Sequence, residues 1–125
     1  MIVGIGVDIV HVPRIEKAIL RWGEQFTLRL FTKEELDYCL GHKNPYHGLA
    51  LRFAAKEACS KALGTGIGQG IGWRDISVSN NDLGRPILNL QGIAIKKAKE
   101  IGANLWHVSL SHEKKYAVAM VVMEN

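Results

Sequence analysis

Asp8 is an acidic residue at a position where an acid is costly unless it is paired or bound to a metal ion. It interrupts the apolar segment Ile2–Val10, and a carboxylate buried among Val and Ile side chains needs a partner. Gly4 and Gly6 fall on the same face of this segment, and we expect them to leave space beside Asp8. Two interpretations stay open: a metal site, or a cap of the turn that leads into Pro13.

Glu57 and Lys61 are a second pair of residues that could do chemistry. They lie four residues apart in a segment with helical periodicity, so they share one face. A Glu–Lys pair at this spacing is commonly an exposed ion pair that contributes only about 0.2–0.5 kcal/mol. Phe53 lies one turn earlier on the same face, which indicates that this face also meets a ligand or another subunit. The spacing alone favours the surface pair and leaves the ligand site open.

A run of glycines follows this segment at every second position, from Gly64 to Gly72, and predicts a flexible or tightly turning chain. It is not a phosphate loop of a standard kind, because it lacks GxxxxGK[ST] and follows a helix where a dinucleotide fingerprint must follow a strand. Lys61 just before the run remains a weak indication of a ligand contact.

The remaining candidates are a histidine and a basic stripe. His112 closes the segment Ser109–His112 at the tip of a predicted strand, where it is either exposed or part of a site. Arg14, Lys17 and Arg21 share one helical face that carries no acid. This face is either solvated or a docking surface for an acidic protein.

The elements that must position these residues are five predicted strands and four predicted helices. Apolar periodicity, capping signals and turn residues predict the boundaries. Thr32 followed by Glu35 is a capping box, and a stripe of alanines marks the longest helix. The predicted strands are Ile2–Val10, Ile76–Ser79, Ile87–Leu90, Leu105–Ser111 and Tyr116–Met123; the predicted helices are Pro13–Trp22, Thr32–Leu40, Leu49–Leu63 and Gly92–Ile101, with a loop over Gly41–Gly48.

This order predicts an α+β fold, in which a largely antiparallel sheet packs with a long helix and shorter helices. The 125 residues fit a single domain over residues 1–125, and 47% hydrophobic and 22% charged residues exclude a disordered or fibrous chain. The net charge of +4 suggests an acidic partner or an anionic substrate. A nucleic-acid-binding module would need more basic residues with interleaved aromatics, so we expect no nucleic acid partner.

The compartment is also indicated by the sequence. Cys39 and Cys59 are far apart and form no CxxC or zinc-type pattern, which favours a reduced, cytoplasmic protein. The first residues lack the basic region of a signal peptide, and no segment approaches the roughly 20 apolar residues that a membrane span needs. We therefore expect no membrane association.

Five motifs follow one another along the chain: Gly6–Val7–Asp8 with Arg14; Phe31–Thr32 with Glu35; Arg52–Ala58 with Lys61–Ala62 and Gly64–Ile67; Gly84–Arg85–Pro86; and Ser109–His112. Taken together, these motifs resemble the holo-[acyl-carrier-protein] synthase family of phosphopantetheinyl transferases. The resemblance covers essentially the whole chain. The third motif is the most specific, whereas the short GxP element, Gly84–Arg85–Pro86, carries little weight by itself.

The resemblance implies a phosphopantetheinyl-transferase-like fold and a Mg²⁺-dependent reaction of fatty acid biosynthesis. Such enzymes move the 4′-phosphopantetheine group of coenzyme A to a serine of apo acyl carrier protein and release adenosine 3′,5′-bisphosphate. It also implies a catalytic role for Asp8, Glu57 and Lys61, with Asp8 and Glu57 as the metal ligands. The coenzyme A pocket would contain Arg52, Lys61, Pro86 and His112.

The same resemblance implies the partners. Arg14 and Arg21 would face the acidic carrier protein, and the chain would form a homotrimer with active sites between subunits, which would give Phe53 a partner. Glu57, acting through a metal-bound water, is the preferred acceptor of the serine proton, and Asp8 is the alternative.

Overall fold

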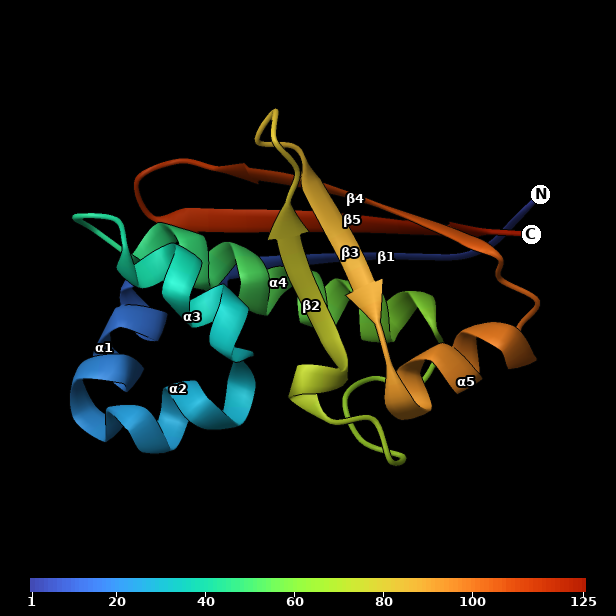
Figure 1. Cartoon of the computed structure of the whole chain (residues 1–125), viewed down its shortest axis with the longest axis horizontal. Coiled ribbons are helices and arrows are strands. Elements are labelled where there is room, and N and C mark those ends of the chain that lie inside the picture. The colour runs from blue at the N-terminus through green and yellow to red at the C-terminus, as the bar shows by residue number, and fades with distance from the viewer.

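A three-stranded antiparallel sheet with a long helix across one face carries the candidate site residues (Figure 1). The computed structural model describes all residues 1–125. The sheet has the order β1-β5-β4, formed by Ile2–His11, Tyr116–Glu124 and Leu105–His112. A separate antiparallel pair joins β2 (Ile76–Asn80) to β3 (Pro86–Leu90). The α+β prediction with antiparallel sheets is confirmed.

The shorter helices lie toward the two ends of the long helix α4. In Figure 1, α1 to α3 gather at one end of the molecule, and α5 lies at the other. None of the helices has both the length and the apolar character needed to cross a membrane. The bounds are α1 Val12–Trp22, α2 Glu24–Leu30, α3 Lys33–Leu40, α4 Tyr46–Ala62 and α5 Gly92–Glu100, with a short 3-10 turn, η1, at Trp73–Asp75.

Strand β1 turns its glycine face, and not its bulky apolar face, toward α4. A Cβ atom at Gly6 would lie 1.9 Å from the carbonyl oxygen of Ala58, and one at Gly4 would lie 2.2 Å from that of Ala62. The expected space beside Asp8 is therefore filled by the backbone of α4. The alanine stripe of α4 is buried in the same contact, as predicted. Only glycine on the strand allows a helix to approach this closely.

The opposite face of β1 carries its large apolar side chains, and no other element of the chain covers them. Ile5, Val7 and Ile9 are 59%, 53% and 66% exposed. On the neighbouring strand β5, Met120 lies opposite Val7 and is also exposed. The sheet thus presents an apolar outer face to the surroundings.

The structure differs from the predicted elements in two places. The segment Glu24–Leu30 had no assignment but forms α2, which follows Gly23 in a backbone conformation with φ of 58°. Helix α4 begins at Tyr46, three residues before the predicted start, because Asn44 Oδ1 accepts a hydrogen bond from the Tyr46 N–H at 3.1 Å. This Asx turn, just before the N-cap Pro45, is a local contact that helical periodicity does not report.

The predicted capping box is present, and its glutamate has a second, buried role. Glu35 Oε1 accepts the Thr32 N–H at 3.0 Å and also binds Lys56 Nζ at 2.7 Å. Lys56 is fully buried and donates further to the carbonyls of Trp73 and Ile76. Burial lowers the pKa of Lys56, although the Glu35 carboxylate opposes that shift. This pair ties α3, α4, η1 and β2 together.

Candidate active site

Asp8, Glu57 and Lys61 come together where β1 crosses α4. Asp8 and Glu57 line a cleft of about 410 Å³, which we call the acid cleft. Lys61 Nζ donates to Asp8 Oδ1 at 3.0 Å and to the carbonyl of Val7 at 3.0 Å. Lys61 is thus paired with Asp8 and forms no ion pair with Glu57. The favoured surface pair of Glu57 and Lys61 was wrong.

The alternative role of Asp8 as a cap is also absent. The N-cap of α1 is His11, which makes no side-chain capping bond, and the carboxylate of Asp8 is bound by Lys61 instead. The close contact of the glycine face with α4 explains the pairing, because it brings β1, from Gly4 to Asp8, against the last turns of the helix. Residues 53 positions apart in the sequence become hydrogen-bonding partners.

The electrostatics of the acid cleft favour a bound cation. Burial raises the pKa of Glu57, the negative charge of Asp8 raises it further, and Lys61 partly opposes both effects. No group of three or more His, Cys, Asp or Glu side chains is arranged to hold a metal ion. Mg²⁺ needs only one or two protein carboxylates when phosphate oxygens and waters complete its shell. Asp8 and Glu57 are a donor set of that kind.

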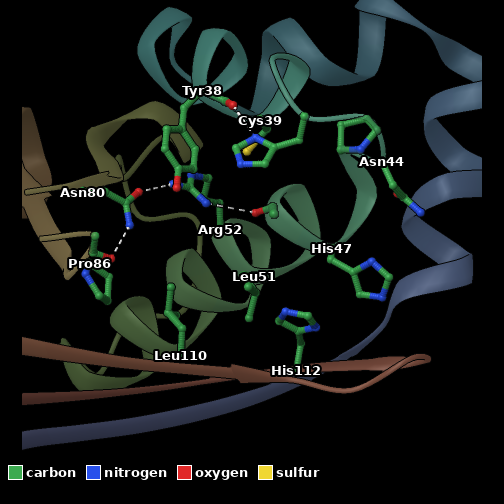
Figure 2. A pocket seen from close by; sticks show the side chains of 14 residues that line it. Tyr38, Cys39, Asn44, His47, Leu51, Arg52, Asn80, Pro86, Leu110 and His112 are labelled. Carbon is green, nitrogen blue, oxygen red and sulfur yellow. Dashed lines mark hydrogen bonds between the residues drawn. The ribbon is translucent and has the colours of Figure 1, made fainter. Parts of the chain in front are cut away.

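Arg52, Pro86 and His112 line a different cavity, which we call the arginine cavity (Figure 2). Its volume is about 500 Å³, and it lies among the start of α4, the end of α3, the β2–β3 pair and the tip of β4. No Asp or Glu is among its lining residues. Its charge is therefore opposite to that of the acid cleft.

Arg52 is the only permanently charged residue of the arginine cavity, and it has no acidic partner. It is 3% exposed, and its two terminal nitrogens donate to the carbonyl of Gly48 at 3.3 Å and to Asn80 Oδ1 at 2.7 Å. Its guanidinium lies 4.7 Å from the centre of the Tyr38 ring, and its Nε makes no hydrogen bond. A buried cation without a counter-charge is costly. The cavity is thus suited to an anionic ligand.

The acid cleft and the arginine cavity share no residue. Arg52 and Glu57 are five positions apart on α4, so their side chains leave the helix about 140° apart. Asp8 on β1 and Leu110 on β4 both lie opposite Ala119 of the central strand β5, two strand spacings or about 10 Å apart. The structure brings Asp8, Glu57 and Lys61 together, and it places Arg52, Pro86 and His112 elsewhere.

Sequence reasoning did not identify the group of aromatic side chains beside the acid cleft. Phe53 stacks on Trp73 with ring centroids 5.1 Å apart, so the contact it makes is within its own chain. The two rings, together with Trp22 and Phe26, line an apolar cleft of about 420 Å³ that shares Phe26 and Phe53 with the acid cleft. Trp73 lies in η1, which has no periodic signal, so only a tertiary contact could reveal it.

The basic stripe of α1 borders the same region. Arg14 is exposed and lines the acid cleft, and Arg21 is exposed with its guanidinium 4.8 Å from the centre of the Trp22 ring. Neither side chain is among the salt bridges of the chain, which are formed by other basic residues. Free positive charge therefore stands at the entrance to the acid cleft.

Comparison with known proteins agrees with these features. Residues 4–121 match the model of the 4′-phosphopantetheinyl transferase superfamily. A holo-[acyl-carrier-protein] synthase of Vibrio parahaemolyticus is 49% identical over 124 residues, which cover 99% of this chain and 98% of that protein. The chain belongs to the holo-[acyl-carrier-protein] synthase family. The resemblance inferred from the motifs is confirmed.

Solved structures of this family share the fold. The synthase from Neisseria meningitidis superposes with a TM-score of 0.91 at 38% identity, and the match covers 100% of both chains. The Helicobacter pylori synthase, in complex with coenzyme A, gives a TM-score of 0.84 at 35% identity over 96% of this chain and 99% of that one. This holo-[acyl-carrier-protein] synthase fold therefore extends over the whole chain.

Proposed function

We propose that the protein transfers the 4′-phosphopantetheine group of coenzyme A to a serine of apo acyl carrier protein, in the cytoplasm and for fatty acid biosynthesis. The observation that carries the proposal is the meeting of Asp8 and Glu57 in one cleft of a family member, with Lys61 bound to Asp8. The free thiols of Cys39 and Cys59 fit a reducing compartment. The products are holo acyl carrier protein and adenosine 3′,5′-bisphosphate.

Asp8 and Glu57 would hold Mg²⁺, which offsets negative charge on the diphosphate of coenzyme A when it is bound. Lys61, 3.0 Å from Asp8, would contact the same phosphates. The serine oxygen forms a bond to the phosphorus on the pantetheine side, and the bond to the adenosine-side phosphate breaks. Glu57 takes the serine proton through a water, a role that its raised pKa supports.

Arg52, Pro86 and His112 would bind coenzyme A from a neighbouring copy of the chain, in a homotrimer. Two observations support this arrangement. The acid cleft and the arginine cavity are separate within one chain, so a ligand that needs both is better served by two copies. The exposed apolar outer face of β1 and β5 is the kind of surface that another copy covers.

The carrier protein would dock over α1. Arg14 and Arg21 supply positive charge without internal partners, and the apolar cleft of Trp22, Phe26, Phe53 and Trp73 lies next to them. An acidic protein that presents an apolar side chain would satisfy both features. This surface leads directly to Asp8 and Glu57, where the serine must react.

Mass spectrometry of the carrier protein tests the function. The protein is mixed with coenzyme A, Mg²⁺ and apo acyl carrier protein, and we expect the mass of one phosphopantetheine to be added to the carrier. The addition should stop in EDTA and return with excess Mg²⁺. An unchanged mass with a carrier that a known synthase does modify would refute the proposal.

Mixed assemblies test whether the active site spans two copies. At a coenzyme A concentration far below the raised KM of Arg52→Ala, the Asp8→Ala and Arg52→Ala proteins should each show little transfer, but co-refolding them in equal amounts should restore about a quarter of the sites, where two intact halves meet. A single-chain site predicts no recovery. The matched control is the double variant Asp8→Ala with Arg52→Ala, refolded by itself. It should show no recovery, because none of its chains supplies an intact half.

A further inference from the structure

His47 is a residue of the arginine cavity to which no motif points. It lies in the first turn of α4, and its ring faces that of His112 on β4 with centroids 4.9 Å apart (Figure 2). The Nε2–H of His47 donates to the carbonyl of Lys114 at 3.1 Å, which holds the ring in place. Its Nδ1 and both ring nitrogens of His112 form no hydrogen bond within the chain. These nitrogens are available to a ligand.

The surroundings of this histidine pair favour an anion from every side. On α4 the nearest charged group in the cavity is the buried guanidinium of Arg52, whose Nε is unpaired. From α3 and the loop after it, Tyr38 and His42 face the cavity, and His42 Nδ1 is engaged by the Tyr38 carbonyl at 2.9 Å. The cavity has no acidic lining residue.

The hairpin after β4 and the start of α4 complete the surroundings of the histidine pair. The hairpin faces His47 with the carbonyl of Lys114, and its one acid, Glu113, accepts the backbone N–H groups of Lys115 and Tyr116. Pro45, the N-cap of α4, lines the cavity, so the positive end of the helix lies there, and no side chain caps it. Two imidazolium groups side by side here would repel each other unless an anion lay between them.

We propose that His47 is a phosphate-binding residue. In its protonated form, His47 binds a phosphate group of coenzyme A together with His112 and Arg52. The inference rests on the proposed function for the identity of the ligand. It assigns to His47 a role that Arg52 alone cannot fill, because a guanidinium keeps its charge at all relevant pH values whereas an imidazole gains its charge between about pH 8 and pH 5. Binding is therefore coupled to proton uptake.

The sign of the coupling follows from linkage. A bound phosphate favours the imidazolium over the neutral ring, so ligand binding takes up a proton and the dissociation constant falls as the pH falls. An opposite charge in contact shifts a proton affinity by about one unit or more, which corresponds to about tenfold in affinity. An asparagine at position 47 takes up no proton and removes this part of the pH dependence.

Calorimetric titration in EDTA isolates the arginine cavity from the metal site. The probes are coenzyme A and 3′-dephospho-coenzyme A, each titrated into the assembled protein at pH 7.5 and pH 6.0. For the unsubstituted protein we expect the dissociation constant of coenzyme A to fall about tenfold between these pH values, and for His47→Asn by clearly less, because only His112 then remains to take up a proton. Protonation of the phosphate itself is the same in both titrations and cancels in their ratio.

His47→Arg and His42→Asn are the matched variants. A fixed charge in His47→Arg should give tight binding at both pH values. His42 lines the same cavity but is held by the carbonyl of Tyr38 in α3, so His42→Asn should keep the pH dependence of the unsubstituted protein. The probe whose pH dependence is reduced by His47→Asn identifies the phosphate that His47 binds.

Two outcomes would overturn the inference: an unchanged pH dependence in His47→Asn for both probes, or an equal loss in His42→Asn. Both leave the proposed function intact as long as the unsubstituted protein binds coenzyme A and modifies the carrier protein. Failure of that protein to bind or transfer at either pH would instead refute the proposed function.

Discussion

The acid cleft and the arginine cavity are built on the same helix and differ in almost every other respect. In the acid cleft, Asp8 is neutralised by Lys61, and Glu57 is left with a raised pKa. In the arginine cavity, Arg52 has no acid to neutralise it. Glu57 in the first site is not paired with a cation, and Arg52 in the second is not paired with an anion. A substrate that carries phosphates, together with a divalent metal, supplies both.

Their construction differs as well. The acid cleft depends on one backbone contact, between Gly6 and the helix at Ala58, which fixes Asp8 relative to Glu57. The arginine cavity is assembled from the ends of several elements, held by hydrogen bonds from Arg52 to Gly48 and Asn80. We therefore expect the acid cleft to fail in an all-or-none way and the arginine cavity to weaken by degrees.

The largest expected effect comes from separating β1 from α4. Gly6→Ala places a Cβ 1.9 Å from the Ala58 carbonyl oxygen, so the strand and helix must move apart, and we expect a loss of more than about 4 kcal/mol or no folded protein. Gly41→Ala is the control, because its φ is −72° and its nearest contact would be 3.4 Å. Urea unfolding compares them; equal stability of the two variants would contradict the close-contact explanation.

The second test compares the chemistry of the two sites directly. Asp8→Asn should lower kcat of the transfer by about 10³-fold, since a charged group next to the reacting phosphates is lost. Arg52→Gln should act mainly by raising KM for coenzyme A, by about tenfold to a hundredfold. Steady-state kinetics with saturating carrier protein separates the two. A pure kcat effect in Arg52→Gln would mean that the arginine cavity is not a binding site.

The third test asks which site the carrier protein approaches. Replacing Arg14 and Arg21 by Glu should raise KM for the carrier protein about tenfold or more and leave KM for coenzyme A nearly unchanged, with an effect that shrinks as salt is added. Lys96→Glu with Lys99→Glu makes the same change of charge on the exposed side of α5. Equal losses in both double variants would indicate a general effect of net charge.

The smallest expected effect concerns Glu57 and stability. Its folded pKa is raised, so the ionised group costs stability once the pH exceeds its ordinary pKa, and this cost is complete above the raised value. Glu57→Gln should therefore raise Tm slightly at pH 7 without metal, while it abolishes transfer. The gain should vanish below about pH 4, where Glu57 is protonated in both states. A gain of the same size at both pH values would contradict this origin.

Much of the fold was predictable because its signals are local. The capping box of Thr32 and Glu35, the alternation of β5 and the alanine stripe of α4 each specify an element and its buried face. Helix α2 was missed because its seven residues are too few for a reliable periodic signal and begin after a glycine with positive φ.

The site was less accessible to local reasoning. Spacing on α4 suggested that Lys61 pairs with Glu57, whereas the true partner, Asp8, lies on a strand far away in the sequence. The family motifs named Asp8, Glu57 and Lys61 together, but a motif does not tell which side of a helix faces which cavity. Arg52 and Glu57 line different cavities because the helical turn separates their directions. This can be recognised only when the position of α4 across the sheet is known.

The contact between β1 and α4 also limits how this protein can change over evolution. An over-packed side chain in a core is often accommodated by shrinking its neighbour. The atom that a side chain at Gly6 would strike is the carbonyl oxygen of Ala58, which every amino acid carries. No substitution on the helix can make room for it. A compensating substitution therefore cannot rescue a side chain at position 6, and a directed-evolution library that varies this position would contain almost no folded members.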